Sequence, residues 1–241
     1  MEDVQPLGRR LAAEALGTGL LVTAVVGSGI AAARLSPDDV GLQLFENAAA
    51  TAAALAVIIL LVGPVSGAHL NPVVSLADWF LGRSRGAGLT LGEVGAYALA
   101  QTAGGIAGAV LANLMFDLPP VTFSTTERSA GHLWLSEVVA TAGLVAVVFA
   151  LARSGRAALS AATVAGYIGA AYFFTSSTSF ANPAVTVARA FTDTFAGIDP
   201  ASVGPYVLAQ VVGAVVGVAT VTLLYPRVAE SADEVLVPHG R

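Results

Sequence analysis

The sequence of 241 residues has no cysteine and no lysine, and only 11% of its residues are charged. Without cysteine, disulfides, thiolate metal sites and cysteine nucleophiles are excluded. Soluble domains carry about 25% charged residues, so an ordinary water-soluble protein is also excluded. All 11 basic residues are scattered arginines, which excludes a nucleic-acid-binding patch. What is present is apolar: 56% of the residues are hydrophobic, and this composition predicts an integral membrane protein.

Long charge-free blocks divide the chain. A spanning helix needs about 20 apolar residues, because every backbone amide in hydrocarbon must be satisfied within the segment. The first block lacks the short core and exit site of a cleavable signal, so we interpret it as a retained span. The sequence therefore predicts an all-α membrane protein with six transmembrane helices, in the blocks 15–33, 47–77, 94–116, 138–152, 157–188 and 200–226.

Two of these blocks, 47–77 and 157–188, are too long for one span and too short for two. Each contains an Asn-Pro box near its far end. Asparagine is a good helix cap, and proline is favoured at the first helical position. We therefore expect a span, a re-entrant loop and a half-helix that begins at membrane depth, where irregular backbone must be buried in protein or line a watery cavity. The two boxes are Asn71-Pro72-Val73 and Asn182-Pro183-Ala184.

The two halves of the chain are similar. GAYALAQ at 95–101 matches GPYVLAQ at 204–210, and Glu14 and Glu137 each open an apolar run. An odd number of spans in each half places the second half upside down, as an inverted repeat. The sequence predicts one domain over 1–241, with a first repeat at 8–116, a second at 132–226 and a cytoplasmic tail at 227–241.

The arginines predict the orientation of the chain. Cytoplasmic loops of membrane proteins carry an excess of basic residues. If the N-terminus is cytoplasmic, most of the arginines fall inside and only Arg34, Arg128 and Arg189 fall outside. We therefore expect a multi-pass protein of the cell (inner) membrane with both termini cytoplasmic.

Half-helices that enter an inverted repeat from opposite faces meet N-terminus to N-terminus. Their positive ends and the amides of Asn71 and Asn182 would face one lumen, which suits neutral hydroxylated molecules and repels cations and protons. At these residues, in SGAHLNPVV and FANPAV, the chain resembles the aquaporin, or major intrinsic protein, family. The resemblance covers the whole chain. It implies a passive channel in the lipid bilayer, assembled as a homotetramer with one pore per protomer.

Buried carboxylates within spans suggest two roles for Glu14 and Glu137. One is a proton relay. The other, which the resemblance implies and which we favour, is to accept hydrogen bonds from the amides of the re-entrant loops. Gln101 and Gln210 would tether the same loops or neighbouring helices. His69 is expected to anchor its loop or line the pore rather than to bind a metal.

The selectivity filter is carried over from the family by gap-free spacing. It falls on Thr51, Ala170, Ser179 and Val185. The family commonly has an aromatic residue where this chain has Thr51 and an arginine where it has Val185. Orthodox water channels commonly have a histidine where it has Ala170. Each change removes volume or charge, so the resemblance predicts a wider constriction that favours solutes larger than water.

Arg189 has two possible roles. It lies four residues after Val185 on the same helix face, and helical side chains lean toward the N-terminus, which would return its guanidinium to the pore mouth. The alternative that we favour is a salt bridge with Asp193, four residues further on, or an interfacial anchor.

The second box suggests a substrate class. SSTSFANPAVTVAR is similar to a bacterial branch associated with arsenic resistance, in which neutral trivalent arsenic hydroxides or methylated arsenicals permeate. We expect a channel for glycerol-like polyols, arsenite and related metalloid hydroxides or methylarsenicals, and water. The alternatives are an orthodox water channel and a proton-coupled secondary transporter that uses Glu14 and Glu137. Because no nucleophile–base pair, metal cluster or phosphate loop is present, we expect no enzyme, cofactor or metal.

Overall fold

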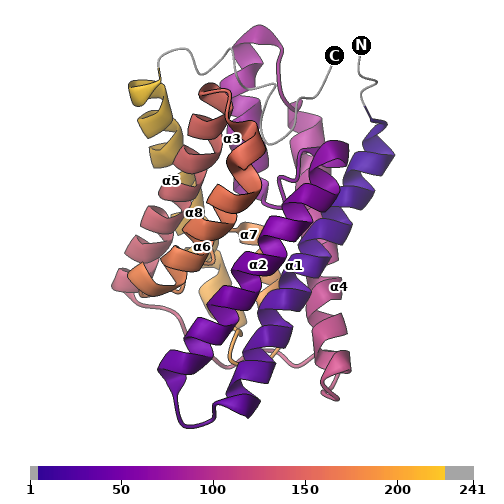
Figure 1. Ribbon diagram of the computed structural model, residues 1–241, viewed down its shortest axis with the longest axis vertical. Helices are drawn as coiled ribbons and strands as arrows, with labels where there is room; N and C mark the ends of the chain where they lie inside the picture. Colours follow the sequence, from indigo (N-terminus) through magenta and orange to yellow (C-terminus); the bar gives the residue numbers. More distant parts are fainter. Residues whose placement is uncertain (1–4, 226–241) are drawn as a thin grey trace.

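The computed structural model describes residues 5–225, and the regular secondary structure of this part of the chain is all helix, without a β-strand (Figure 1). The predicted tail, 227–241, lies outside the described residues. Six helices are long and apolar enough to cross a membrane, which confirms the predicted fold class. They are α1 (Leu7–Leu35), α2 (Val40–Ser66), α4 (Leu91–Met115), α5 (Gly131–Arg153), α6 (Ser160–Phe174, after the 3-10 turn Ala157–Leu159) and α8 (Pro200–Leu224).

Two short helices lie where the Asn-Pro boxes predict them. The helix α3 (Pro72–Gly82) follows α2, and α7 (Pro183–Arg189) follows α6. Asn71 and Asn182 are their N-caps, and each box proline occupies the first turn. The helix α2 ends at Ser66, and its C-cap Gly67 has a left-handed φ of 85° that glycine adopts without strain. Each over-long charge-free block therefore holds a span, a loop and a half-helix.

The two halves pack in the same way. The helix α1 packs most extensively against α4, and α5 against α8. A Cβ atom at Gly104 or Gly108 would overlap the backbone of Ala15 or Gly19, so these α4 glycines let α1 approach closely. In the second half, Gly213 and Gly217 of α8 meet the α5 backbone.

Four of the spans begin before their charge-free blocks: α1, α2, α4 and α5. The helix α1 begins at Leu7 and includes Arg10, whose guanidinium forms an ion pair with Glu93 of α4. Charged side chains are tolerated there because they reach from a helix end toward the polar interface. The start of α1 and the end of α8 lie at the same end of the bundle (Figure 1), as an even number of spans requires.

Candidate functional site

The N-termini of the two half-helices meet inside the bundle. The Asn71 Nδ2 donates to the Ala181 carbonyl at 2.8 Å, and the Asn182 Nδ2 donates to the Leu70 carbonyl at 2.7 Å. The oxygen of each amide caps its own half-helix, accepting from the Val73 amide on one side and from the amide of Ala184 on the other. An amide nitrogen carries two N–H donors, so the bond to the opposite loop uses one of them. Both asparagines line a central cavity.

Glu14 holds the first re-entrant loop. One carboxylate oxygen accepts from the Ser66 hydroxyl (2.7 Å) and the His69 amide (2.9 Å), and the other accepts from the Leu70 amide and the Gln101 side chain, both at 2.7 Å. The carboxylate is fully buried and does not line the cavity. It therefore accepts hydrogen bonds from loop N–H groups that would otherwise be buried without a partner.

Glu137 repeats this arrangement in the second loop. It accepts from the Ser177 hydroxyl at 2.6 Å, from the amides of Phe180 (2.9 Å) and Ala181 (2.8 Å), and from the Gln210 side chain at 2.7 Å. Gln210 also donates to the Thr186 hydroxyl at 2.8 Å. The loops need such anchors because several of their residues adopt positive φ, which is costly for residues other than glycine; these are Ala68, Leu70, Thr178, Ser179 and Ala181.

His69 belongs to both the loop and the cavity. Its Nδ1 lies 3.0 Å from the Ser75 hydroxyl, and its ring lies 5.5 Å from that of Tyr97. It also lines the cavity. Among residues 5–225, no group of three or more His, Cys, Asp or Glu side chains is placed to hold a metal ion.

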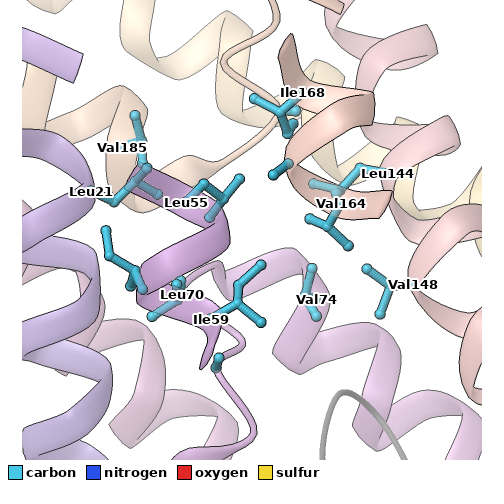
Figure 2. Packing of buried hydrophobic residues seen from close by; sticks show 14 of the residues in the cluster. Leu21, Leu55, Ile59, Leu70, Val74, Leu144, Val148, Val164, Ile168 and Val185 are labelled. Atoms are coloured by element: carbon cyan, nitrogen blue, oxygen red, sulfur yellow. The ribbon is translucent and has the colours of Figure 1, made fainter. Parts of the chain in front are cut away.

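The cavity has a volume of about 70 Å³ and lies between the half-helices and four of the spans. Its wall is mostly apolar, and the labelled side chains of Figure 2 all belong to it. Each span contributes residues spaced by four, which share one face of a helix. They are Leu21 and Val25 of α1, Thr51, Leu55 and Ile59 of α2, Leu144 and Val148 of α5, and Val164, Ile168 and Tyr172 of α6.

Three of the four predicted filter residues line this cavity: Thr51, Ser179 and Val185. The prediction for Ala170 is wrong, because Ala170 is exposed on the opposite face of α6. It lies two residues from both Ile168 and Tyr172, and two residues correspond to about 200° around a helix. Gap-free counting across the α6–α7 loop assumed a loop length that this chain does not have. The Tyr172 hydroxyl, which the prediction missed, lies 3.3 Å from the Thr51 hydroxyl.

Arg189 also lines the cavity, although only 2% of its surface is exposed. Its Nε donates to the Ala196 carbonyl, and its Cζ lies 3.4 Å from the centre of the Phe180 ring. The favoured salt bridge with Asp193 is not formed, because α7 ends at Arg189 and the four-residue helical spacing ends with it. Asp193 instead accepts from the amide and hydroxyl of Thr125, at 3.0 and 3.2 Å.

The charge of Arg189 is thus stabilised by a carbonyl and an aromatic face. Arg189 forms no ion pair with an acidic residue of the described range. Phe180 contacts a second cation as well, since the Arg128 Cζ lies 5.1 Å from its ring centre. Sequence reasoning missed Phe180 and Tyr172. The spacing of four that links Val164, Ile168 and Tyr172 is a signal that can identify the tyrosine.

Comparisons with known proteins agree with this geometry. Residues 4–180 match the major intrinsic protein family. The chain is 53% identical over 213 residues to the aquaglyceroporin AqpS of Rhizobium meliloti strain 1021, covering 88% of each protein. It is 31% identical over 166 residues to the glycerol uptake facilitator protein of Pseudomonas aeruginosa, covering 59% of this chain and 57% of that one. The X-ray structure of the aquaglyceroporin from Plasmodium falciparum shares the fold, with a TM-score of 0.70, 21% identity and coverage of 92% of this chain and 99% of that one.

Proposed function

The chain belongs to the major intrinsic protein family of passive membrane channels, and we propose that its pore conducts neutral solutes of polyol size, trivalent metalloid hydroxides and water. It is a multi-pass membrane protein and not an enzyme. The observation that carries the proposal is the meeting of two asparagine-capped half-helices at an amphipathic cavity inside six spans.

The electrostatics of the cavity favour neutral solutes. Two half-helix N-termini carry positive partial charge, and Arg189 adds a full positive charge. The cavity is lined by no aspartate or glutamate among the described residues. A cation would therefore lose its hydration without a compensating anion.

The size and polarity of the wall favour polyols. Val185 and Thr51 are smaller than the arginine and aromatic residue that the family commonly has at these positions. The polar groups are few, among them Asn71, Asn182 and Thr51, and the remaining wall is largely apolar. A polyol presents a hydroxyl edge and a C–H edge, so it can bind the amides while its other edge contacts the aliphatic side chains.

Arsenous acid and related metalloid hydroxides present the same chemistry. They are uncharged near neutral pH and display hydroxyl groups over a size similar to that of glycerol. A methylated arsenical adds a methyl group that suits the aliphatic wall. The chain has no cysteine, so no thiolate can trap trivalent arsenic in the pore.

An orthodox water channel is the second candidate. Tyr172 and Arg189 add an aromatic ring and a cation near Thr51 and Val185, and both narrow the passage that the small residues open. A proton-coupled transporter has less support, because Glu14 and Glu137 are occupied by the re-entrant loops and lie outside the cavity wall.

Stopped-flow measurements on proteoliposomes separate the three functions. We expect the protein to accelerate the entry of water, glycerol and arsenous acid over empty liposomes, with equilibrium uptake unchanged by a proton ionophore. Acceleration of water alone would indicate the orthodox water channel. Uptake of neutral solute above equilibrium that the ionophore abolishes would indicate the transporter.

We further propose a homotetramer in the inner membrane with both termini cytoplasmic. The family resemblance and the distribution of arginines support this arrangement. The cysteine-free chain allows a direct test of orientation, because any introduced cysteine is unique. We expect a membrane-impermeant thiol reagent added to intact cells to label Val121→Cys, in the α4–α5 loop, and not Ser154→Cys, after α5. Native mass spectrometry tests the tetramer.

A further inference from the structure

A second cavity lies away from the pore, between α3 and α8. Its volume is about 190 Å³, and all of its lining side chains are apolar. Trp79 and Phe80 of α3 form one wall, and Ala214, Val215 and Val218 of α8 form the other. Phe80 is 44% exposed and Val215 is 65% exposed, so this cavity is a groove on the outside of the bundle. Because α8 is a membrane span, we place the groove in contact with the bilayer.

An arginine side chain lies beside this groove. Arg83 follows directly after α3, and its Cζ lies 3.7 Å from the centre of the Phe80 ring and 5.4 Å from that of the Trp79 ring. The guanidinium is thus held against both aromatic residues of the groove. Arg83 is exposed and forms no ion pair with any acidic residue between positions 5 and 225.

We propose that this groove binds an anionic phospholipid, with part of one acyl chain between α3 and α8 and the phosphate on Arg83. The wholly apolar walls match a hydrocarbon chain, and the arginine at one end matches a headgroup charge. Guanidinium groups bind phosphate oxygens through paired N–H donors. Tryptophan and arginine at a helix end are also the residues that anchor a protein at the membrane interface. We favour the lipid over a second copy of this chain, because the arginine beside the apolar walls suits a phosphate headgroup.

Native mass spectrometry of the full-length protein tests the headgroup contact. Phosphatidylglycerol and phosphatidylcholine with identical acyl chains are titrated separately, and the binding constant of the first lipid is compared. One basic residue near an anionic surface favours the anionic lipid by roughly fivefold. We expect that preference in the wild type, its loss in Arg83→Gln through weaker binding of phosphatidylglycerol, and its retention in Arg156→Gln. Arg156 is an exposed arginine between α5 and α6, outside the groove.

A second variant tests the groove itself. Val215→Phe adds bulk to an exposed lining position without altering Arg83. We expect it to weaken the binding of both lipids to a similar extent. Equal affinity of the wild type for the two lipids, or unchanged preference in Arg83→Gln, would overturn the proposal. Unchanged lipid binding with a changed oligomeric state in Val215→Phe would assign the groove to contacts between copies instead.

Discussion

Positions 185 and 189 lie one helical turn apart on α7. In the family, one arginine commonly both narrows the pore and supplies positive charge, whereas here these two properties belong to different positions. A turn of helix advances by about 5.4 Å. Val185 leaves room at its level of the cavity, while Arg189 supplies positive charge one turn further along. We therefore expect position 185 to control the size of the permeating solute and Arg189 to control the exclusion of cations.

Replacement of Arg189 tests the charge. Arg189→Gln removes the cation but keeps a polar side chain of moderate length, so we expect a larger leak of sodium and protons with a nearly unchanged ratio of glycerol to water flux. Arg128→Gln is the matched control, because Arg128 contacts the same Phe180 ring and does not line the cavity. Ion-leak assays in proteoliposomes provide the readout. Equal leaks in the two variants would contradict this assignment.

The box asparagines connect the two loops through single donors. Asn71→Asp and Asn182→Asp each keep an oxygen that can cap the half-helix but lose the N–H that reaches the opposite carbonyl. A buried carbonyl left without its donor costs about 1–3 kcal/mol. We expect a lower thermal midpoint in each variant, with reduced water flux or increased proton leak because an anion then faces the positive helix ends. Wild-type flux and proton leak in both would defeat the assignment of the pore.

At the level of residues, the sequence placed a side chain in the cavity where a motif lay nearby. Val185 and Ser179 are fixed by their distance from Asn182, and both reach the cavity. Ala170 failed because its position depended on the length of a loop that reverses through left-handed residues. The pairing of Arg189 with Asp193 failed because it assumed that α7 continued for another turn. In both cases the missing information was loop geometry, which spacing alone does not contain.

At the scale of elements, close helix pairs depend on glycine. Gly104→Ala places a methyl group against the Ala15 carbonyl, and overpacking of this kind costs about 1–3 kcal/mol. Gly95→Ala, in the same helix, meets no atom within 4 Å and gains up to about 1 kcal/mol of helix propensity. We expect the first variant to lower the thermal midpoint in detergent and the second to leave it unchanged or raise it. Similar midpoints would contradict the close approach of α1 and α4.

The re-entrant loops are elements that depend on one carboxylate each. Glu137→Gln replaces one acceptor oxygen with an NH₂ group that faces existing N–H donors, so we expect a loss of about 3 kcal/mol in stability. Glu127→Gln, at an exposed position, is the control and should have no effect. Thermal unfolding followed by circular dichroism measures both. An unchanged thermal midpoint for Glu137→Gln would contradict the role of Glu137 as the anchor of the second re-entrant loop.

The elements themselves were largely predictable. Apolar length identified six spans, and the two Asn-Pro boxes identified where α3 and α7 begin. The ends were not predicted: α1 begins at Leu7 although the charge-free block begins at 15. A search for charge-free blocks excludes Arg10 and Glu14 from the first span. In the folded helix, Arg10 forms an ion pair near the helix end, and Glu14 accepts hydrogen bonds in a buried network.

At the scale of the whole molecule, a symmetric frame carries an asymmetric pore. The repeats share the same tethers, yet His69 of the first loop corresponds to Phe180 of the second (180 − 69 = 182 − 71), and Asp78 corresponds to Arg189 by the same offset. The symmetric positions hold the half-helices. Of the asymmetric ones, His69, Phe180 and Arg189 line the cavity, whereas Asp78 does not. The frame follows from the sequence pattern, but the shape of the pore depends on how six helices tilt together.

Val185→Arg tests whether the small residue at position 185 admits solutes larger than water. Stopped-flow permeabilities to glycerol and water are measured in proteoliposomes that contain equal amounts of wild type and variant. An added guanidinium in the cavity that position 185 lines narrows the pore, so we expect glycerol flux to fall by about tenfold or more while water flux falls much less. An unchanged ratio of glycerol to water flux in Val185→Arg, with a raised ratio in Arg189→Gln, would contradict this role of position 185 and show that Arg189 sets the width of the pore.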